Sequence, residues 1–178
     1  VAADGSSWIW TPDRSEAYLT RDKGASWQSC RGLPKNIRVI ADKVNPQRFY
    51  AVDAVAEILY SSEDGGATFH ADTLNLTVKR FQQRGNAGAA VRRGDPRGGQ
   101  DRIYATPGRE KDLWIAAYDG LYRSAASEKF DFRALDKVRT IYAFGFGKAK
   151  PGNDYPAIYL IGVVNGQYGF FRSDDAAN

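Results

Sequence analysis

The chain has 178 residues, of which 43% are hydrophobic and 13% aromatic, which is enough for one domain with a sizeable core. Its single cysteine, Cys30, excludes an internal disulfide, and no run approaches the roughly 18 consecutive apolar residues of a membrane span. The lack of such a run means that we expect no membrane partner. His70 is the one histidine, so we expect no metal site and no Ser/His/Asp triad. We expect no cofactor either.

The net charge of +4 comes from one segment of the chain. Between Lys79 and Arg102, seven basic residues stand against two acidic ones, so the remainder carries a net charge of −1. This segment is rich in glycine and has little hydrophobic periodicity, which is typical of an exposed loop. It lacks the interleaved aromatic residues of a surface that binds single strands, so we expect no nucleic-acid partner. We interpret residues 76–101 as a basic loop insertion.

Short runs rich in β-branched and aromatic residues alternate with turn residues elsewhere, and no run has a helical period. The fold class is therefore all-β. Residues 1–3 are interpreted as the end of a strand. The other expected strands are 7–11, 16–20, 27–30, 37–41, 48–52, 57–61, 67–71, 102–105, 112–117, 120–124, 130–134, 139–146, 157–164 and 168–172. They group into four units, roughly 1–31, 37–74, 102–135 and 137–178.

Two turns share the pattern hydroxyl, any, Asp, any, Gly, any, hydroxyl, aromatic, which is that of the Asp-box. The Asp should accept hydrogen bonds from the backbone N–H groups that follow it. The Gly supplies a positive φ, and the aromatic ring should pack between neighbouring sheets. We interpret both turns as structural rather than catalytic. The residues in these roles are Asp22, Gly24 and Trp27 in one turn and Asp64, Gly66 and Phe69 in the other.

Two further copies of the pattern are incomplete. One begins at Ser173 and includes Asp175, and a decayed one begins at Ser124 and has Ala126 in place of the Asp. The complete copies place Asp22 and Asp64 42 residues apart, within the roughly 40 to 45 residues of a four-stranded propeller blade.

The sequence therefore predicts about four consecutive four-stranded blades of a β-propeller, with the first and last blades incomplete. A blade cannot bury both faces alone, so neighbouring blades must stack. Such a piece should expose apolar sheet surface at its ends. The absence of methionine and the interrupted third box indicate a piece of a longer protein.

A series of motifs runs in a fixed order along nearly the whole chain apart from the basic loop. They are Val1–Ser6, Gly32–Pro34, Ala41–Pro46, Phe49–Tyr50, Tyr60–Phe69, Pro107–Ile115, Gly120–Ser124, Phe144–Ala149, Tyr155–Tyr159 and Gly166–Asp175. This order resembles the C-terminal propeller of glycoside hydrolase family 74, the xyloglucanases. The chain departs from the family at Ala176 and Ala177, where the family continues with Gly-Gly.

The resemblance implies a secreted, inverting endo-β-1,4-glucanase made of two seven-bladed propellers, with xyloglucan or a related β-glucan bound between them. The partners of this segment would then be the rest of its own ring and a second propeller domain. Two aspartates carry the chemistry in this family, one on each propeller. No Asp here matches either motif, so no catalytic residue is assigned. Asp119 and Asp154 would be the first pair to mutate if this chain alone turned over substrate.

Exposed aromatic rings are the residues that stack on sugar faces, and several are candidates for substrate contact. Tyr118, at the turn before Gly120, is the preferred one, followed by Trp114 and Trp10; Trp8 and Tyr168 are weaker candidates. Two other functions stay open. One is a sialidase, which would need an arginine triad, a tyrosine nucleophile and an acid/base residue. The other is a non-catalytic propeller that binds protein ligands, as sortilin-type receptors do.

Overall fold

The structure is a computed structural model that describes residues 1–53, 56–74, 102–117, 120–127 and 129–177. Within these ranges the chain forms strands and turns and no helix, which confirms the all-β class. The predicted basic loop and Tyr118 lie outside the described residues. The strands are β1 (Trp8–Trp10), β2 (Tyr18–Thr20), β3 (Gln28–Ser29), β4 (Val39–Ala41), β5 (Phe49–Asp53), β6 (Ile58–Ser62), β7 (His70–Thr73), β8 (Arg102–Ala105), β9 (Leu113–Ala117), β10 (Gly120–Ser124), β11 (Arg133–Ala134), β12 (Val138–Gly147), β13 (Ala157–Val164) and β14 (Gln167–Ser173).

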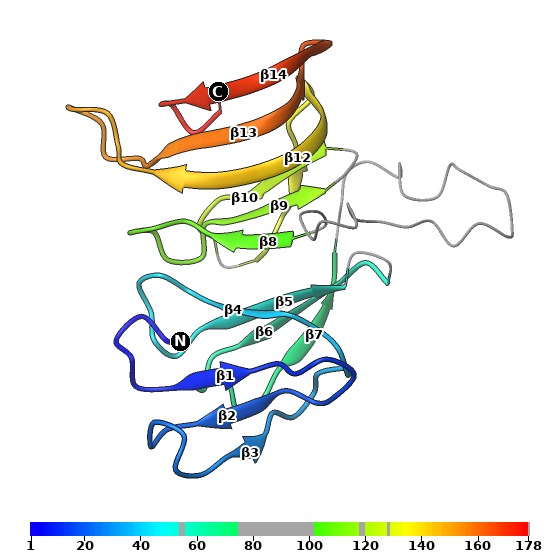
Figure 1. The fold of residues 1–178 in the computed structure, drawn as a ribbon, viewed down its shortest axis with the longest axis vertical. Helices are drawn as coiled ribbons and strands as arrows, with labels where there is room; N and C mark the ends of the chain where they lie inside the picture. Colours follow the sequence, from blue (N-terminus) through cyan, green and yellow to red (C-terminus); the bar gives the residue numbers. More distant parts are fainter. Residues whose placement is uncertain (54–55, 75–101, 118–119, 128, 178) are drawn as a thin grey trace, which may run out of the picture.

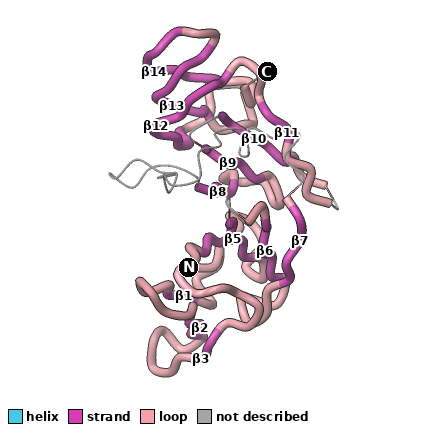
Figure 2. Tube along the Cα trace, turned by 90° about the vertical axis from the view of Figure 1, so that its right-hand side faces the viewer, coloured by secondary structure: helices cyan, strands magenta, loops and turns pink. Residues whose placement is uncertain are grey.

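These strands form four antiparallel sheets, each a simple meander in chain order. The first sheet is β1-β2-β3, the second β4-β5-β6-β7, the third β8-β9-β10-β11 and the fourth β12-β13-β14. The sheets follow one another along the long axis of the molecule (Figures 1 and 2). Two four-stranded sheets between two three-stranded ones fit a partial propeller. The prediction for residues 1–3 is wrong, because they form no strand.

The outermost strand of the second sheet begins later than predicted, at His70 rather than at Ala67. The residues before it pair instead with the first sheet, through a parallel bridge between Arg31 and Thr68. The Arg31 N–H donates to Ala67 O at 2.9 Å, and the Phe69 N–H donates to Arg31 O at 2.9 Å. We call these two hydrogen bonds the Arg31 clamp. The clamp joins two sheets through the backbone, and period-2 patterning in the sequence does not show it.

Three apolar cores fill the spaces between consecutive sheets. Neighbouring residues on one strand serve different cores, because successive side chains of a strand point to opposite faces. On β5, Phe49 packs in the first core and Tyr50 in the second. On β9, Leu113 packs in the second core and Trp114 in the third. The second and third sheets therefore bury both faces, whereas the first and fourth bury one.

The outer faces of the first and fourth sheets carry exposed aromatic side chains. On the first sheet the exposed fractions are 57% for Trp10 and 42% for Trp27. On the fourth they are 45% for Tyr159, 69% for Tyr168 and 83% for Phe170. The prediction that this piece exposes apolar sheet surface at its ends is confirmed.

Candidate functional site

The turns of the stacked meanders lie along two opposite edges, because consecutive turns of a meander alternate between the two ends of its sheet. One edge carries the turns 20–27, 62–69 and 173–177, which we call the first, second and terminal repeat turns. The Gly65 N–H donates to Gln47 O at 2.9 Å and ties the second repeat turn to the neighbouring β4–β5 turn. Turns such as 11–17 and 165–166 lie along the other edge.

The second repeat turn is organised by the Asp64 carboxylate. Its Oδ1 accepts hydrogen bonds from the N–H groups of Ala67 and Thr68, both at 2.9 Å, and from Ser62 Oγ at 2.8 Å. Ser62 Oγ in turn accepts from the Gly66 N–H at 3.0 Å. Burial acts to raise the pKa of Asp64, but the hydrogen bonds from Thr68 and Ser62 outweigh it and hold the pKa below its ordinary value. This carboxylate holds the turn together and is not directed at a ligand.

The first repeat turn has a similar network in an exposed setting. Asp22 Oδ1 accepts from the Ser26 N–H at 2.9 Å and from Thr20 Oγ1 at 2.7 Å. The hydrogen bonds from Ser26, and then the one from Thr20, lower the pKa of Asp22 to about 2. The expectation that Trp27 packs between sheets stays a prediction, because the described residues include only one of the two sheets it would lie between. Its counterpart Phe69 is 4% exposed, whereas Trp27 lies on a face that no other described sheet covers.

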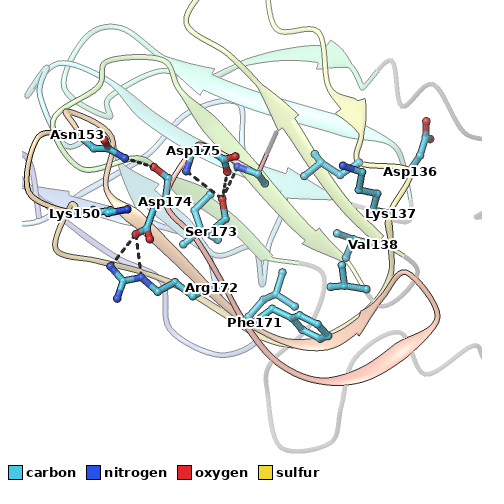
Figure 3. A pocket seen from close by; sticks show the side chains of 15 residues that line it. Asp136, Lys137, Val138, Lys150, Asn153, Phe171, Arg172, Ser173, Asp174 and Asp175 are labelled. Carbon is cyan, nitrogen blue, oxygen red and sulfur yellow. Dashed lines mark hydrogen bonds and ion pairs between the residues drawn. The ribbon is translucent and has the colours of Figure 1, made fainter.

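The terminal repeat turn repeats the hydroxyl-centred network with a different residue pair after its Asp. Ser173 Oγ donates to Asp175 Oδ1 at 2.6 Å and accepts from the Ala177 N–H at 2.8 Å (Figure 3). Ala176 and Ala177 have φ values of 59° and 65°, in the region that favours glycine. The turn therefore forms here with alanines where the second repeat turn has glycines.

The described part of the chain buries two carboxylates, and the first of them, Asp42, is completely enclosed. It accepts hydrogen bonds from the N–H groups of Val44, Asn45 and Lys111 at 2.8, 3.0 and 3.0 Å, and from the Tyr50 hydroxyl at 3.1 Å. Burial, followed by the Asp42 charge, raises the pKa of Tyr50 far above its ordinary value. Because Lys111 belongs to the third sheet and Tyr50 to the second, Asp42 links the two sheets.

The second buried carboxylate, Asp112, is 2% exposed. Arg123 contacts it through both Nε and Nη2, at 3.1 and 2.8 Å. The Tyr155 hydroxyl donates to it at 3.0 Å and accepts from Trp114 Nε1 at 3.0 Å. The network joins β9, β10 and the segment before β13, so it holds the third and fourth sheets together. A buried ion pair of this kind satisfies its own charges and leaves no free acid or base.

The structure separates the aromatic candidates for sugar contact. Trp114 is 0% exposed, so the expectation that it forms an exposed stacking surface is wrong. The signal was in the sequence, since Leu113–Ala117 is a continuous apolar run, which is typical of a strand covered on both faces. Trp10 is exposed and packs against Tyr18 and Trp27, with ring centroids 6.2 and 5.9 Å apart.

Among the described residues, the other candidate groups do not assemble into a catalytic site. The Asp154 side chain is 92% exposed and paired with Arg109 at 2.7 Å, and Asp119 lies outside the described residues. The two best-buried arginines among the ion pairs are also engaged, Arg48 with Glu63 and Glu110, and Arg123 with Asp112. The described ranges hold no group of three potential metal ligands and no helix that could span a bilayer.

Comparison with known proteins identifies the relatives of the chain. No family profile matches it. The curated xyloglucanase Xgh74A of Acetivibrio thermocellus is 38% identical over 176 residues, which is 99% of this chain and 18% of the relative. The structure of a GH74 enzyme from Niastella koreensis superposes with a TM-score of 0.77 at 29% identity, covering 99% of this chain and 23% of that one.

A GH74 xyloglucanase from Xanthomonas campestris gives a TM-score of 0.75 at 31% identity, with the same coverage of 99% and 23%. The chain thus spans less than a quarter of each of these three relatives. Each of these similarities nevertheless extends over 99% of this chain. The chain is therefore similar over nearly all of its length to a propeller segment of xyloglucanases of glycoside hydrolase family 74.

Proposed function

We propose that this chain is part of a glycosidase that cleaves the β-1,4-glucan backbone of xyloglucan. In that enzyme the segment supplies propeller scaffold and part of the wall of the substrate cleft. The observation that carries the proposal is the similarity to a xyloglucanase at 38% identity over 99% of this chain. Because the chain spans 18% of that relative, the rest of its own ring and a second propeller domain supply the remainder. We further propose that the enzyme is secreted, since its proposed substrate is a polysaccharide.

The carboxylates support a scaffold role for this segment. Inverting hydrolysis needs an acid and a base about 6.5 to 9.5 Å apart on either side of the bond to be cleaved. In the described residues, the carboxylates of Asp42 and Asp112 accept hydrogen bonds that link neighbouring sheets. Those of Asp22 and Asp64 accept hydrogen bonds within their own turns. We therefore place the catalytic pair outside this segment.

Sugar contact is proposed for the edge that lies opposite the repeat turns. Trp10 lies at the β1 end of that edge, is 57% exposed, and forms an aromatic surface with Tyr18. Tyr118 keeps its place as a candidate from its position in the sequence beside Gly120. A pyranose ring stacked on such a surface would bind through its C–H groups without needing a charged partner.

The test is release of reducing sugar from tamarind-type xyloglucan by this chain and by a longer protein that contains it. We expect turnover by the longer protein and none by the chain alone. If the longer protein left xyloglucan intact, the proposed function would be wrong. Turnover by the chain alone would overturn the scaffold role and direct mutagenesis to Asp119 and Asp154.

Sugar binding is tested separately by retardation of the chain in gels that contain xyloglucan. Trp10→Ala should weaken the retardation, because it removes an exposed stacking surface. Phe170→Ala is the matched control, since Phe170 is 83% exposed but lies in the middle of β14 on the fourth sheet. Equal loss in both variants would contradict the assignment of Trp10.

A further inference from the structure

Each of the last three sheets has an arginine where its first strand begins. Arg38 directly precedes β4, Arg102 is the first residue of β8, and Arg139 is the second residue of β12. Arg38 and Arg139 are exposed, and Arg102 is half-buried. All three lie toward the edge opposite the repeat turns, because each of these strands runs from that edge to the edge of the repeat turns. We call them the rim arginines.

The first two rim arginines occupy equivalent positions on neighbouring sheets. They stand two residues before Ile40 and Tyr104, which pair with Tyr50 and Trp114 on the next strand of their own sheets. Tyr50 and Trp114 each pack in the core toward the following sheet, so the two registers correspond. The strands β4 and β8 also contact each other. The two guanidinium groups therefore project from matching points of adjacent strands.

The rim arginines differ from the other arginines of the described ranges in having no carboxylate partner there. The others are engaged, two of them with the acceptors Asp64 O and Thr68 Oγ1 and the rest in ion pairs: Arg21, Arg31, Arg14, Arg48, Arg109, Arg123, Arg133 and Arg172. The strands β4, β8 and β12 contain no Asp or Glu. Within the described ranges, no neighbouring carboxylate therefore compensates the positive charge of the rim.

The Tyr104 side chain lies beside two of the rim arginines. Its ring packs against Phe144 of β12, with the ring centroids 4.9 Å apart, and its hydroxyl accepts a hydrogen bond from the Arg102 side chain. Burial raises the pKa of Tyr104, while the positive charges of Arg102 and Arg38 act in the opposite direction. One hydroxyl and two guanidinium groups are therefore gathered at the rim.

The distribution of charge along the sequence favours the same edge. The segment from Lys79 to Arg102 has seven basic residues against two acidic ones, and the rest of the chain has a net charge of −1. The described residues that flank this segment, Leu74 after β7 and Arg102 on β8, lie toward the edge opposite the repeat turns. Concentrated charge of one sign attracts an oppositely charged ligand from a distance. The site itself consists of described residues only.

We propose that Arg38, Arg102 and Tyr104 bind a carboxylate of an acidic polysaccharide, one that contains uronic acid residues. The planar guanidinium group matches a carboxylate through two parallel hydrogen bonds, and the tyrosine hydroxyl bonds to a neighbouring sugar hydroxyl. Arg139 on the next first strand extends the site. The role is binding rather than cleavage, because these strands offer no carboxyl group as an acid. The choice of a sugar as the carrier rests on the proposed function, which assigns sugar contact to this edge.

The probe is a short oligomer of galacturonic acid, titrated by calorimetry into the full 178-residue chain. A neutral glucose oligomer of the same length is the control ligand. We expect saturable binding of the acidic oligomer and roughly tenfold or more weaker binding of the neutral one, because hydrogen bonds between charged groups are the stronger ones. The affinity should also fall as salt is added. Equal affinities, or no binding of the acidic oligomer, would overturn the proposal.

Substitutions of single arginines give the matched test. Arg38→Gln and Arg102→Gln each remove one guanidinium group and should weaken the acidic oligomer roughly tenfold. Arg38→Lys keeps the charge without the planar fork, so it should retain only part of the affinity. Arg133→Gln removes the same charge from β11, where the side chain is 81% exposed and paired with Asp131. This control should leave the affinity within about twofold, since an exposed charge far from the ligand is screened. Circular dichroism checks the folding of each variant.

Three results would contradict the site. An equal loss in Arg133→Gln would show that the net charge alone attracts the oligomer. Full affinity in a variant that lacks both Arg38 and Arg102 would place the binding elsewhere, on the basic segment. Displacement of the acidic sugar by single-stranded DNA at the same concentration would show a surface that takes any polyanion. None of these measurements involves hydrolysis, so the site and the proposed glycosidase activity can each fail alone.

Discussion

The second and fourth sheets share one strand order and one kind of repeat turn, but they differ at the edge that follows this turn. The second has four strands, glycines at positions 65 and 66, and Phe69 sealed against the first sheet. The fourth has three strands, alanines at positions 176 and 177, and a groove of about 730 Å³ beside β14. The hydroxyl-centred turn nevertheless forms in both. The turn is thus a local structure, whereas closing the space between two sheets depends on the aromatic ring.

The largest effect is expected at that ring. Phe69→Ala should destabilise the chain by about 3 to 5 kcal/mol, the usual loss for a buried phenylalanine. The reason is that it leaves a cavity between the first and second sheets like the groove beside β14. Urea unfolding would measure this. Phe170→Ala on the exposed face is the control, and a change beyond about 0.5 kcal/mol there would weaken the comparison.

Gly66→Ala is expected to cost about 2 to 4 kcal/mol, for two reasons that add. The φ of Gly66 is +91°, and a Cβ there would collide with Ile9 Cδ1 of the first sheet. Gly65→Ala separates the two reasons. Its φ is +73°, but a Cβ would meet the flexible ends of Gln47 and Arg21 at 3.2 and 3.3 Å. Thermal melts should show a clearly smaller loss for Gly65→Ala, and equal losses would show that the collision does not matter.

Asp64→Ala should destabilise by about 1 to 3 kcal/mol, because two backbone N–H groups and the Ser62 hydroxyl lose their acceptor. Its lowered folded-state pKa makes the contribution pH-dependent. The stabilisation is complete above the ordinary pKa of an aspartate, about 4, and is lost as pH falls through the lower folded-state value.

Chemical denaturation of wild type and Asp64→Ala at several pH values checks this dependence. The difference in unfolding free energy should be constant from about pH 5 to 7 and shrink below about pH 4. A difference that grew on acidification would contradict the role of the carboxylate as acceptor. Loss of hydrolysis by a longer parent protein without any change in stability would show that the carboxylate has a chemical role instead.

The smallest effect is a gain. Ala177→Gly should stabilise the terminal repeat turn by about 0.5 to 1 kcal/mol, because it removes a side chain from a backbone with φ of 65°. Added freedom of the unfolded chain offsets part of the gain. Hydrogen exchange at the residue 177 amide, which donates to Ser173 Oγ, reports the local stability. Faster exchange in the glycine variant would show that the turn does not strain its alanines.

Much of the fold could be predicted because strands and repeat turns are local features. Val, Ile, Tyr and Phe between turn residues placed most strands within a few residues, and the 42-residue spacing indicated blades. The sequence says less about aromatic residues whose surroundings are distant in sequence. Trp27 and Phe69 occupy the same place in one motif, yet only Phe69 has a described sheet opposite it.

The candidate site was less predictable for the same reason. Trp114 looked like a sugar contact, but residues of the fourth sheet cover it, and its indole donates to Tyr155, 41 positions away. Its burial follows from the sheets on both sides of β9, which only three-dimensional stacking reveals. The roles of Asp42 and Asp112 were missed too. Their partners Lys111 and Tyr155 belong to the following sheet in each case, so no short sequence motif predicts these contacts.

The Arg31 clamp has a mechanical consequence. Because the backbone just before β7 is bonded to the first sheet, a force that peels β7 from its own sheet is transmitted to the neighbouring one. Both bonds are made by the backbone of one residue, Arg31, so a force that separates the two sheets loads them together. When the chain is pulled, each unfolding step should therefore release a strand and an intersheet contact at the same time, so the sheets should not unfold independently of one another.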